Sequence, residues 1–158
     1  MSDDPWLSAS EQRAWRSFLA MQRQLNTHLY RHMQREFGLS ASDYEILVNL
    51  SESPTGRMRA FELGEATDWE KSRMSHHLTR MAQRGLVRRE PCADDSRYAD
   101  IVLTEEGRTA IADAAPHHAA NVRAWFIEAV GKERLDVIEE ASDAVLTALA
   151  QYKARAEG

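Results

Sequence analysis

Apolar residues recur at helical spacing along the N-terminal region, residues 8–37, and the pattern ends at Phe37-Gly38. The repeating positions are Trp15, Phe18, Leu25, Leu29 and Met33. Packing, more than intrinsic propensity, stabilises an amphipathic helix of this kind. The pattern therefore predicts a long terminal helix that needs a partner surface.

The C-terminal region repeats this arrangement after Ala115-Pro116, first over residues 121–130 and then, beyond Gly131, over residues 135–152. The apolar positions are Val122, Trp125, Phe126, Val130, Leu135, Ile138, Val145, Leu149 and Tyr152. Two terminal helical regions predict a bundle in which helices from both ends pack together. A bundle shared between two subunits is the main interpretation, and a monomeric bundle is the alternative.

The middle of the chain carries a different series of signals. Ser40-Ala-Ser-Asp43 offers N-caps for a helix, and Pro54-Thr-Gly56 marks a turn after it. A short helix is expected over residues 60–66, followed after Thr67-Asp68 by a longer helix over residues 69–84. Two helices joined by a tight turn are typical of a helix-turn-helix.

Gly85 occupies the position that favours glycine after a helix. Residues 86–89 and 101–103 then predict two strands around the polar stretch 93–100. Helix, short helix, turn, helix and hairpin is the order of a winged helix-turn-helix. The chain is thus expected to be mainly α, with a small β-hairpin wing.

Composition limits the class of protein. The chain has 158 residues, 43% of them hydrophobic, which is enough for a core. No apolar run approaches the roughly 20 residues of a membrane span, and residues 1–12 lack the features of a signal peptide. The single cysteine, Cys92, has no partner for an internal disulfide, so we expect a cytoplasmic protein.

The net charge of −5 argues against nucleic acid, but the charge is unevenly distributed. Residues 71–89 contain six basic side chains and no acidic ones. They are Lys71, Arg73, Arg80, Arg84, Arg88 and Arg89. A solvated basic helix would give the same composition, so the neighbouring residues must decide.

The predicted helix over residues 69–84 separates into two faces at about 100° per residue. Met74, Leu78 and Met81 fall together as a narrow buried stripe, and His77 lies near it in a packing position. The opposite face consists of Ser72, His76, Thr79, Arg80 and Gln83, with Arg73 and Arg84 on its flank. These donors suit phosphates and base edges, and no carboxylate interrupts them.

Position along this helix predicts individual roles, because its N-terminus enters the major groove first. The candidates for base contact are Ser72, Arg73 and His76, and the candidates for phosphate contact are Lys71, Thr79 and Arg80. At the hairpin tip, Arg97 is expected to enter the minor groove while Asp95 orients its guanidinium. The alternative is a local surface pair of these two residues.

These segments resemble the MarR family of bacterial regulators over most of the chain. The resemblance is densest over residues 56–64, 69–76 and 84–88. In the wing, Asp95-x-Arg97 is followed by Leu103-Thr104-Glu-Glu-Gly107, the family's D-x-R-x5-L-T-x-x-G spacing. Two positions depart from the family pattern, because Ser96 stands in place of a basic residue and Tyr98 in place of glycine.

The resemblance implies a homodimer with a dimerisation helix in 1–38, a winged helix-turn-helix in 39–108 and dimerisation helices in 109–158, forming one intertwined domain. It also implies binding to a pseudo-palindromic site in double-stranded DNA, repression by promoter occupancy, and release by a small anionic or phenolic effector. The matching positions are Ser72, Arg73, Ser75 and His76 in the recognition helix, Arg97 as the minor-groove arginine and Asp95 as the wing support. The alternative is a helical dimer that acts mainly through protein contacts, with a degenerate winged module.

In this family's layout, four residues approach a cleft where an effector would bind. They are Trp15, Arg16, His28 and Tyr44. An aromatic wall with a cation suits an aromatic carboxylate, which makes these residues the predicted ligand site.

Other chemistry has less support. No phosphate-binding glycine loop or nucleophile elbow is present, and Ser72 and His76 have no acid placed to orient the histidine, so no enzyme is expected. His28, His32 and the pair His117-His118 could converge on zinc across a dimer, but no cysteine cluster accompanies them, and neither metal nor cofactor is predicted.

Cys92 lies beside Pro91 on the expected wing strand. Arg88 and Arg89 could lower the pKa of its thiol and make it a redox sensor. An incidental small residue is the favoured interpretation.

Overall fold

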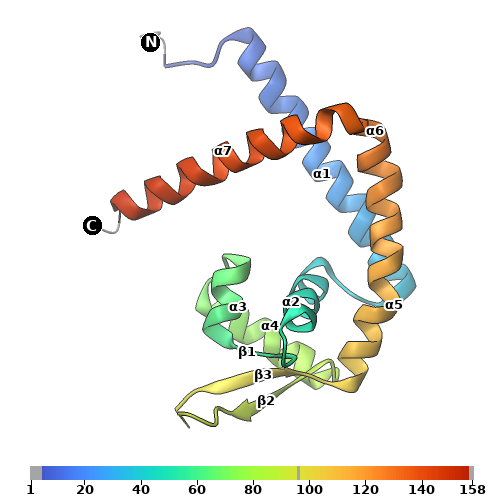
Figure 1. Cartoon of the computed structure of the whole chain (residues 1–158), viewed down its shortest axis with the longest axis vertical. Coiled ribbons are helices and arrows are strands. Elements are labelled where there is room, and N and C mark those ends of the chain that lie inside the picture. Colours follow the sequence, from blue (N-terminus) through green and yellow to red (C-terminus); the bar gives the residue numbers. More distant parts are fainter. Residues whose placement is uncertain (1–4, 96, 157–158) are drawn as a thin grey trace. The chain divides into compact units, whose positions relative to one another are not determined.

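The computed structural model describes residues 5–95 and 97–156, which form a mainly helical chain with one small sheet (Figure 1). The elements are α1 (Ala9–Phe37), α2 (Ala41–Glu52), β1 (Arg57–Arg59), α3 (Ala60–Thr67), α4 (Lys71–Gln83), β2 (Val87–Pro91), β3 (Ala99–Leu103), α5 (Glu105–Val122), a π-helical turn (Arg123–Ile127), α6 (Glu128–Val130) and α7 (Lys132–Ala156). They confirm the predicted fold class. The chain forms two compact units, residues 1–118 and 119–158.

Local caps fix the ends of α1. The Ser8 hydroxyl accepts a hydrogen bond from the Glu11 N–H at 3.3 Å, while the Glu11 carboxylate accepts from the Ser8 N–H at 2.7 Å. At the other end Gly38 has φ 65°, a left-handed conformation that suits glycine. Both ends agree with the predicted helix over residues 8–37.

The first unit is built around a core shared by α2, α3, α4 and the sheet. Met74, Leu78 and Met81 are at most 2% exposed, which confirms the predicted stripe on α4. The stripe belongs to one apolar cluster with residues of α2, α3 and β3, among them Ile46, Leu47, Leu50, Leu63, Ile101 and Leu103. The core therefore faces one side of α4 and leaves its polar side exposed.

The sheet has the order β1-β3-β2 and is antiparallel throughout. The β2–β3 hairpin was predicted, and its register pairs Val87 with Leu103 and Pro91 with Ala99. Strand β1 was not predicted. It has three residues, and its partner β3 lies about forty positions later, so no local pattern marks it.

The junction between the hairpin and α5 requires glycine. A Cβ on Gly107 would overlap the carbonyl oxygen of Leu86 and crowd the Leu103 side chain. The Thr104 hydroxyl donates to the carbonyls of Gly85 and Leu86 and accepts from the Gly107 N–H. The Leu103-Thr104-x-x-Gly107 sequence thus locks the base of the wing to the end of α4.

Helix α5 begins at Glu105 and continues through Pro116, so the predicted segment boundary at 108/109 falls inside one helix. The second unit continues from residue 119 into α6 and α7, and Gly131, at φ 82°, separates these two helices as expected.

Within the described residues no helix is both long and apolar enough to span a bilayer.

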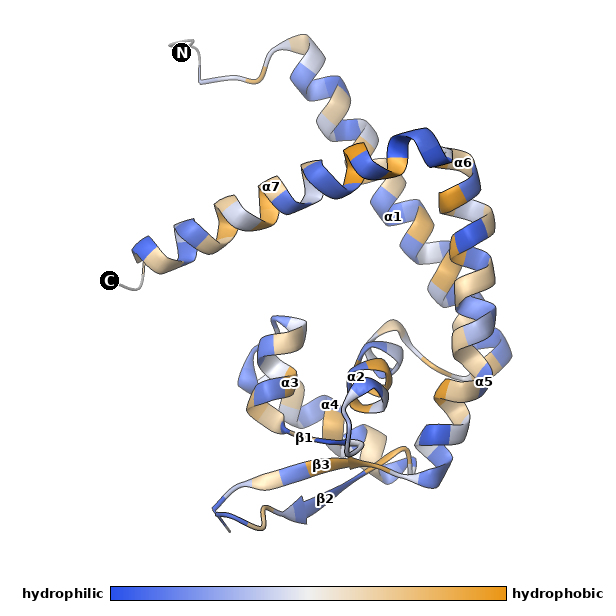
Figure 2. Ribbon diagram, viewed as in Figure 1, coloured by the Kyte–Doolittle hydropathy of each residue, from blue (hydrophilic) through white to orange (hydrophobic). Residues whose placement is uncertain are grey.

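No residue of α7 is buried, although hydrophobic and hydrophilic residues alternate along it (Figure 2). Its exposed large hydrophobic residues are Val137, Val145, Leu146, Leu149 and Tyr152. Helix α1 buries only Leu29 and Met33. Both helices thus present apolar surface that could cover another surface.

Candidate nucleic-acid interface

Helix α4 exposes every one of its side chains that was predicted to contact DNA. They are Lys71, Ser72, Arg73, Ser75, His76, Thr79 and Arg80. His77, in contrast, is 8% exposed, in agreement with the packing position expected for it. The sequence of α4 thus separates a buried stripe from a continuous polar face.

The cations of α4 and of its C-cap residue, Arg84, differ in what holds them. Arg84 forms an ion pair with the buried Asp43, Nη1 to Oδ2 at 2.7 Å, and its Nη2 donates to the Gly38 carbonyl at 2.7 Å. Across residues 5–95 and 97–156, neither Lys71, Arg73 nor Arg80 pairs with a carboxylate. Arg84 therefore stabilises the fold, whereas the other three are exposed cations without an ion pair among the described residues.

Arg73 lies over an aromatic ring at the start of α4. Its guanidinium carbon is 3.9 Å from the centroid of Trp69, a cation–π contact. Trp69 in turn contacts His77 edge-on, with ring centroids 5.5 Å apart. The Trp69 side chain therefore restricts the positions that the Arg73 guanidinium can take.

Arg89 of β2 ties the wing to α4. Its Nη2 donates to the Ser75 carbonyl at 3.0 Å and to the Thr79 hydroxyl at 3.2 Å. The Thr79 hydroxyl also donates to the Ser75 carbonyl. The basic cluster in the sequence included Arg89, but only the strand register shows that it reaches the polar side of α4.

A groove of about 710 Å³ opens between the start of α4, α3 and the hairpin. Cations and aromatic rings line it, among them Arg59, Lys71, Arg89, Arg97, Phe61, Trp69 and Tyr98. Three carboxylates, Glu65, Asp68 and Glu70, line the same groove, so its four cations leave only a small positive excess. The sequence did not predict a contribution from Arg59, because β1 was not predicted.

At the hairpin tip Asp95 holds Arg97 in a two-point contact, with Nε–Oδ1 at 2.9 Å and Nη2–Oδ2 at 2.6 Å. Hydrogen bonds from Arg97 lower the pKa of the Asp95 carboxyl. The Arg97 side chain remains 81% exposed. An orienting role of Asp95 and a local surface pair would both give this contact, so the orienting role stays a prediction. Ser96, one of the two departures from the family pattern, lies outside the described residues.

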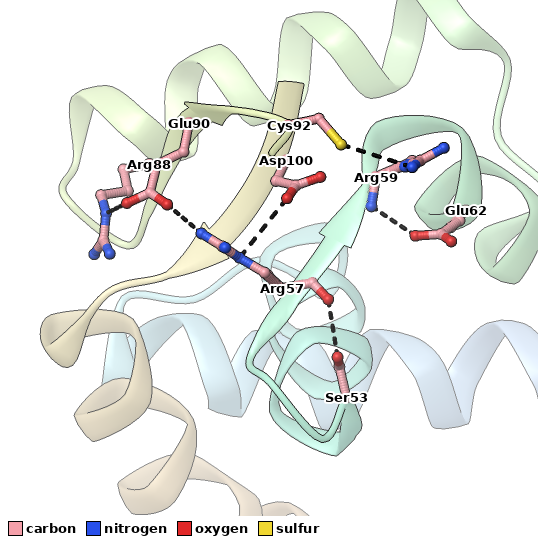
Figure 3. A network of polar contacts seen from close by, with 8 residues as sticks. All are labelled: Ser53, Arg57, Arg59, Glu62, Arg88, Glu90, Cys92 and Asp100. Carbon is pink, nitrogen blue, oxygen red and sulfur yellow. Dashed lines mark hydrogen bonds and ion pairs between the residues drawn. The ribbon is translucent and has the colours of Figure 1, made fainter. Parts of the chain in front are cut away.

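A network of polar contacts crosses the three strands at the base of the wing (Figure 3). Arg57 of β1 pairs with Glu90 of β2 and lies 3.8 Å from Asp100 of β3, Nε to Oδ2. Arg88 Nε donates to the same Glu90 at 2.6 Å. Arg57 thus joins the three strands, while Arg88 contacts Glu90 within β2.

Cys92 is buried just after β2, with its sulfur 3.6 Å from Arg59 Nη2 (Figure 3). The guanidinium beside the thiol is therefore that of Arg59. Arg88 and Arg89, the neighbours expected from the sequence, are engaged with Glu90 and with α4 instead.

The four predicted ligand residues do not come together in this chain. Trp15 stacks on Phe18, with ring centroids 5.9 Å apart, while Tyr44 contacts His118 at 4.5 Å. Trp15 and His28 are thirteen positions apart on one helix, or about 20 Å along its axis. A single small molecule could contact all four only if a second subunit contributed.

The paired histidines of α5 pack against aromatic rings. His117 contacts Phe37, and His118 contacts Tyr30 as well as Tyr44. In the part of the chain that the structure describes, no three His, Cys, Asp or Glu side chains form a group that could hold a metal ion.

Comparison with known proteins agrees with this architecture. Residues 37–97 match the sequence profile of the MarR family. The transcriptional repressor YetL of Bacillus subtilis is 26% identical, over 72% of this chain and 75% of its own length.

Two solved structures from Streptomyces coelicolor are more similar. AbsC, a MarR family transcriptional regulator, is 44% identical over 94% of this chain and 99% of its own, with a TM-score of 0.89. Sco3205, a regulator of the same family solved in complex with DNA, is 36% identical over 94% of this chain and 93% of its own, with a TM-score of 0.88. With such identity over nearly its whole length, the chain belongs to the MarR family of transcriptional regulators.

Proposed function

We propose that the chain is a repressor that binds a pseudo-palindromic site in double-stranded DNA as a homodimer. The observation that carries this proposal is the exposed polar face of α4, where Lys71, Arg73 and Arg80 pair with no carboxylate of the described residues. Sco3205 was solved with DNA, and YetL is a transcriptional repressor, which supports the same function. Such a target places the action of the protein in the cytoplasm.

In the proposed complex the N-terminal half of α4 enters the major groove. There Ser72, Arg73 and His76 would contact bases, with Ser75 beside them, because the start of a recognition helix goes deepest. The phosphate contacts are assigned to Lys71, Thr79 and Arg80. From the hairpin tip, Arg97 would reach the minor groove.

The homodimer would be formed by segments 1–38 and 109–158, while residues 39–108 bind DNA. Exposed apolar side chains on α1, such as Trp15 and Phe18, and on α7, such as Leu146, support this division. A symmetric dimer places two α4 helices on two half-sites, as a pseudo-palindromic operator requires.

A small anionic or phenolic effector would release the dimer from DNA. We assign Trp15, Arg16, His28 and Tyr44 to its site, contributed by both subunits because of their separation along α1. Isothermal titration of benzoate and phenol against the wild type and Arg16→Ala tests the assignment. Equal affinity for the two proteins would remove Arg16 from the site.

A second candidate function is a helical dimer that acts through protein contacts. The wing favours it, because Asp95 partly neutralises Arg97 and Tyr98 occupies the tip. Salt dependence discriminates between the two functions. A protein that contacts several phosphates loses orders of magnitude in affinity between low and physiological salt.

The proposed function is tested by fluorescence anisotropy with duplex from upstream of the gene itself and with a random duplex. We expect nanomolar binding to the first and much weaker binding to the second. Arg73→Ala should reduce discrimination at one base pair per half-site by roughly 1–3 kcal/mol, whereas Arg80→Ala should weaken both duplexes alike.

Arg13→Ala is the matched control, since it removes the same charge from the distant half of α1 and should leave affinity unchanged. Equal loss of specific and random binding in Arg73→Ala would refute its base-reading role. If no genomic fragment selected from the whole chromosome binds above background, the protein-contact function stands instead.

A further inference from the structure

A buried imidazole lies directly beneath the exposed face of α4. His77 places Nε2 3.0 Å from Oδ1 of Asp43 on α2, and Nδ1 3.0 Å from Nη2 of Arg80. The ring is 8% exposed, while Arg80 lies on the exposed side of the helix. The His77 imidazole thus contacts both the buried Asp43 carboxylate of α2 and Arg80, a cation on the proposed DNA face of α4.

Hydrogen-bond chemistry determines the form of this imidazole. Arg80 can only donate, so Nδ1 of His77 must be the acceptor. An ionised Asp43 can only accept, so Nε2 must carry the hydrogen. The neutral tautomer with its proton on Nε2 is the form that satisfies both contacts. A protonated ring would turn an N–H toward the Arg80 guanidinium and lose that bond.

We propose that His77 is a positioning residue, which holds the Arg80 guanidinium in place for a DNA phosphate and is itself anchored to α2 through Asp43. This inference rests on the proposed DNA-binding function. A long arginine side chain loses rotamer freedom when it binds a phosphate, and a side chain that is already held loses less. His77 would therefore raise affinity without touching DNA.

The anchor itself is well held. Asp43 is 2% exposed and accepts hydrogen bonds from the Arg84 guanidinium at 2.7 Å and from the Ser40 N–H at 3.0 Å. Burial raises the pKa of the Asp43 carboxyl, but these bonds and the Arg84 charge outweigh it and leave the pKa below its ordinary value. The carboxylate stays ionised and fixed, so the imidazole that donates to it cannot turn away from Arg80.

The ionisation of His77 agrees with this geometry. Burial lowers the pKa of the imidazole, Asp43 opposes the shift, and the charges of Arg80 and Arg73 add to it. The net pKa lies below the ordinary value, so the ring is mostly neutral at pH 7 and available as an acceptor for Arg80.

Two isosteric variants separate the two contacts of the ring. His77→Gln places an amide near Nε2 and keeps the contact with Asp43, but it removes the acceptor for Arg80. His77→Asn places an amide oxygen near Nδ1 and keeps that acceptor, but it loses the donor to Asp43. We expect His77→Gln to weaken DNA binding roughly three- to tenfold with little change in unfolding temperature, as loss of one hydrogen bond predicts. For His77→Asn we expect a lower unfolding temperature with little change in DNA affinity.

A double-mutant cycle with Arg80→Ala tests the coupling directly, with anisotropy as the readout. If His77 acts through Arg80, adding His77→Gln to Arg80→Ala changes affinity less than twofold. Independent effects would multiply instead, and that result would overturn the proposal. DNA affinity that falls in parallel with unfolding temperature in both His77 variants would overturn it as well, because that is the behaviour of a purely structural residue.

The same experiment separates this inference from the function on which it rests. If the wild type binds no duplex above background, the proposed function fails and the inference fails with it. If the wild type binds and Arg80→Ala weakens binding, but His77→Gln matches the wild type, only the positioning role fails. If Arg80→Ala binds like the wild type, Arg80 contacts no phosphate and the positioning role is likewise overturned.

Discussion

Three arginines of α4 and its C-cap have different roles, and the partner of each guanidinium determines its role. The Arg73 guanidinium stacks on Trp69, that of Arg80 contacts His77, and that of Arg84 pairs with Asp43. A cation held by an aromatic or neutral ring keeps its full charge for a ligand, whereas a cation paired with a buried carboxylate is largely neutralised. The three residues therefore separate into two ligand-facing cations and one structural one.

Arg84→Ala should destabilise the fold much more than it affects charge on the DNA face. The substitution leaves the Asp43 carboxylate buried without its cation and removes the bond to the Gly38 carbonyl. We expect the free energy of unfolding to fall by about 2–3 kcal/mol, less than for a fully buried pair because Arg84 is half exposed. Urea denaturation measures this loss.

Arg73→Ala is the matched control for that prediction, because it removes an exposed arginine of the same helix that pairs with no carboxylate of the described residues. Its free energy of unfolding should fall by no more than about 1 kcal/mol, the size of an exposed cation–π contact such as the one that Arg73 makes with Trp69. Equal losses in the two variants would show that the Asp43–Arg84 pair is not what stabilises this region.

The packing of α5 on α1 and α2 gives the stability of the first unit a pH dependence. His118 lies between Tyr30 and Tyr44, and burial lowers the pKa of its imidazole. Its buried Nδ1 has no hydrogen-bond partner among the described residues. The folded state therefore disfavours protonation of His118, whereas the unfolded chain binds the proton at an ordinary pKa.

The sign of the effect follows from proton binding. Between the lowered folded pKa and the unfolded pKa near 6.5 the unfolded state holds more protons, so stability falls as pH decreases below about 7. His118→Phe keeps the ring contacts and removes the titration. The drop in unfolding temperature between pH 7 and pH 5.5 should be smaller in this variant than in the wild type, with the exposed His76→Phe as control. Identical pH profiles for His118→Phe and the wild type would exclude this source.

Helix ends and the hairpin could be predicted from sequence because their signals are local. Ser8, Gly38, Ser40 and Gly85 each act within a few residues of the end that they mark. Strand β1 could not be predicted in this way, because its hydrogen bonds go to β3.

The roles of charged residues were harder to separate for the same reason. The basic cluster of residues 71–89 indicated the interface, but the partners that distinguish Arg84 from Arg80 are Asp43 and Gly38, which lie 41 and 46 positions earlier. Composition and spacing locate a charged face, whereas long-range partners determine which of its charges are available to a ligand.

At the scale of the whole molecule, exposed apolar side chains on the two terminal helical regions indicate why the winged module carries such long helical extensions. The exposed large apolar side chains of α7 extend from Val137 to Tyr152, and the apolar positions of the first half of α1 are exposed as well. Apolar surface of this extent is costly in water and marks an interaction surface. Covering it with a second copy would also bring two α4 helices to one DNA site.

Leu146→Glu tests this coupling between assembly and DNA binding. Leu146 is 63% exposed on α7, so the substitution should leave the fold of each chain intact. Two-fold symmetry places the new charge in the interface twice, and each lost leucine removes roughly 1.5–3 kcal/mol, so dimerisation should weaken by about 100-fold or more. Sedimentation velocity at micromolar concentration should then show monomer, and affinity for a two-half-site duplex should fall in step.

Thr147→Glu, which adds the same charge to the neighbouring exposed position, is the control and should remain dimeric. A duplex with a single half-site should bind wild type and Leu146→Glu equally, because one α4 contacts it in either case. If Leu146→Glu stays dimeric, or if it loses the half-site as severely as the full site, the apolar side of α7 is not what joins the two DNA-binding modules.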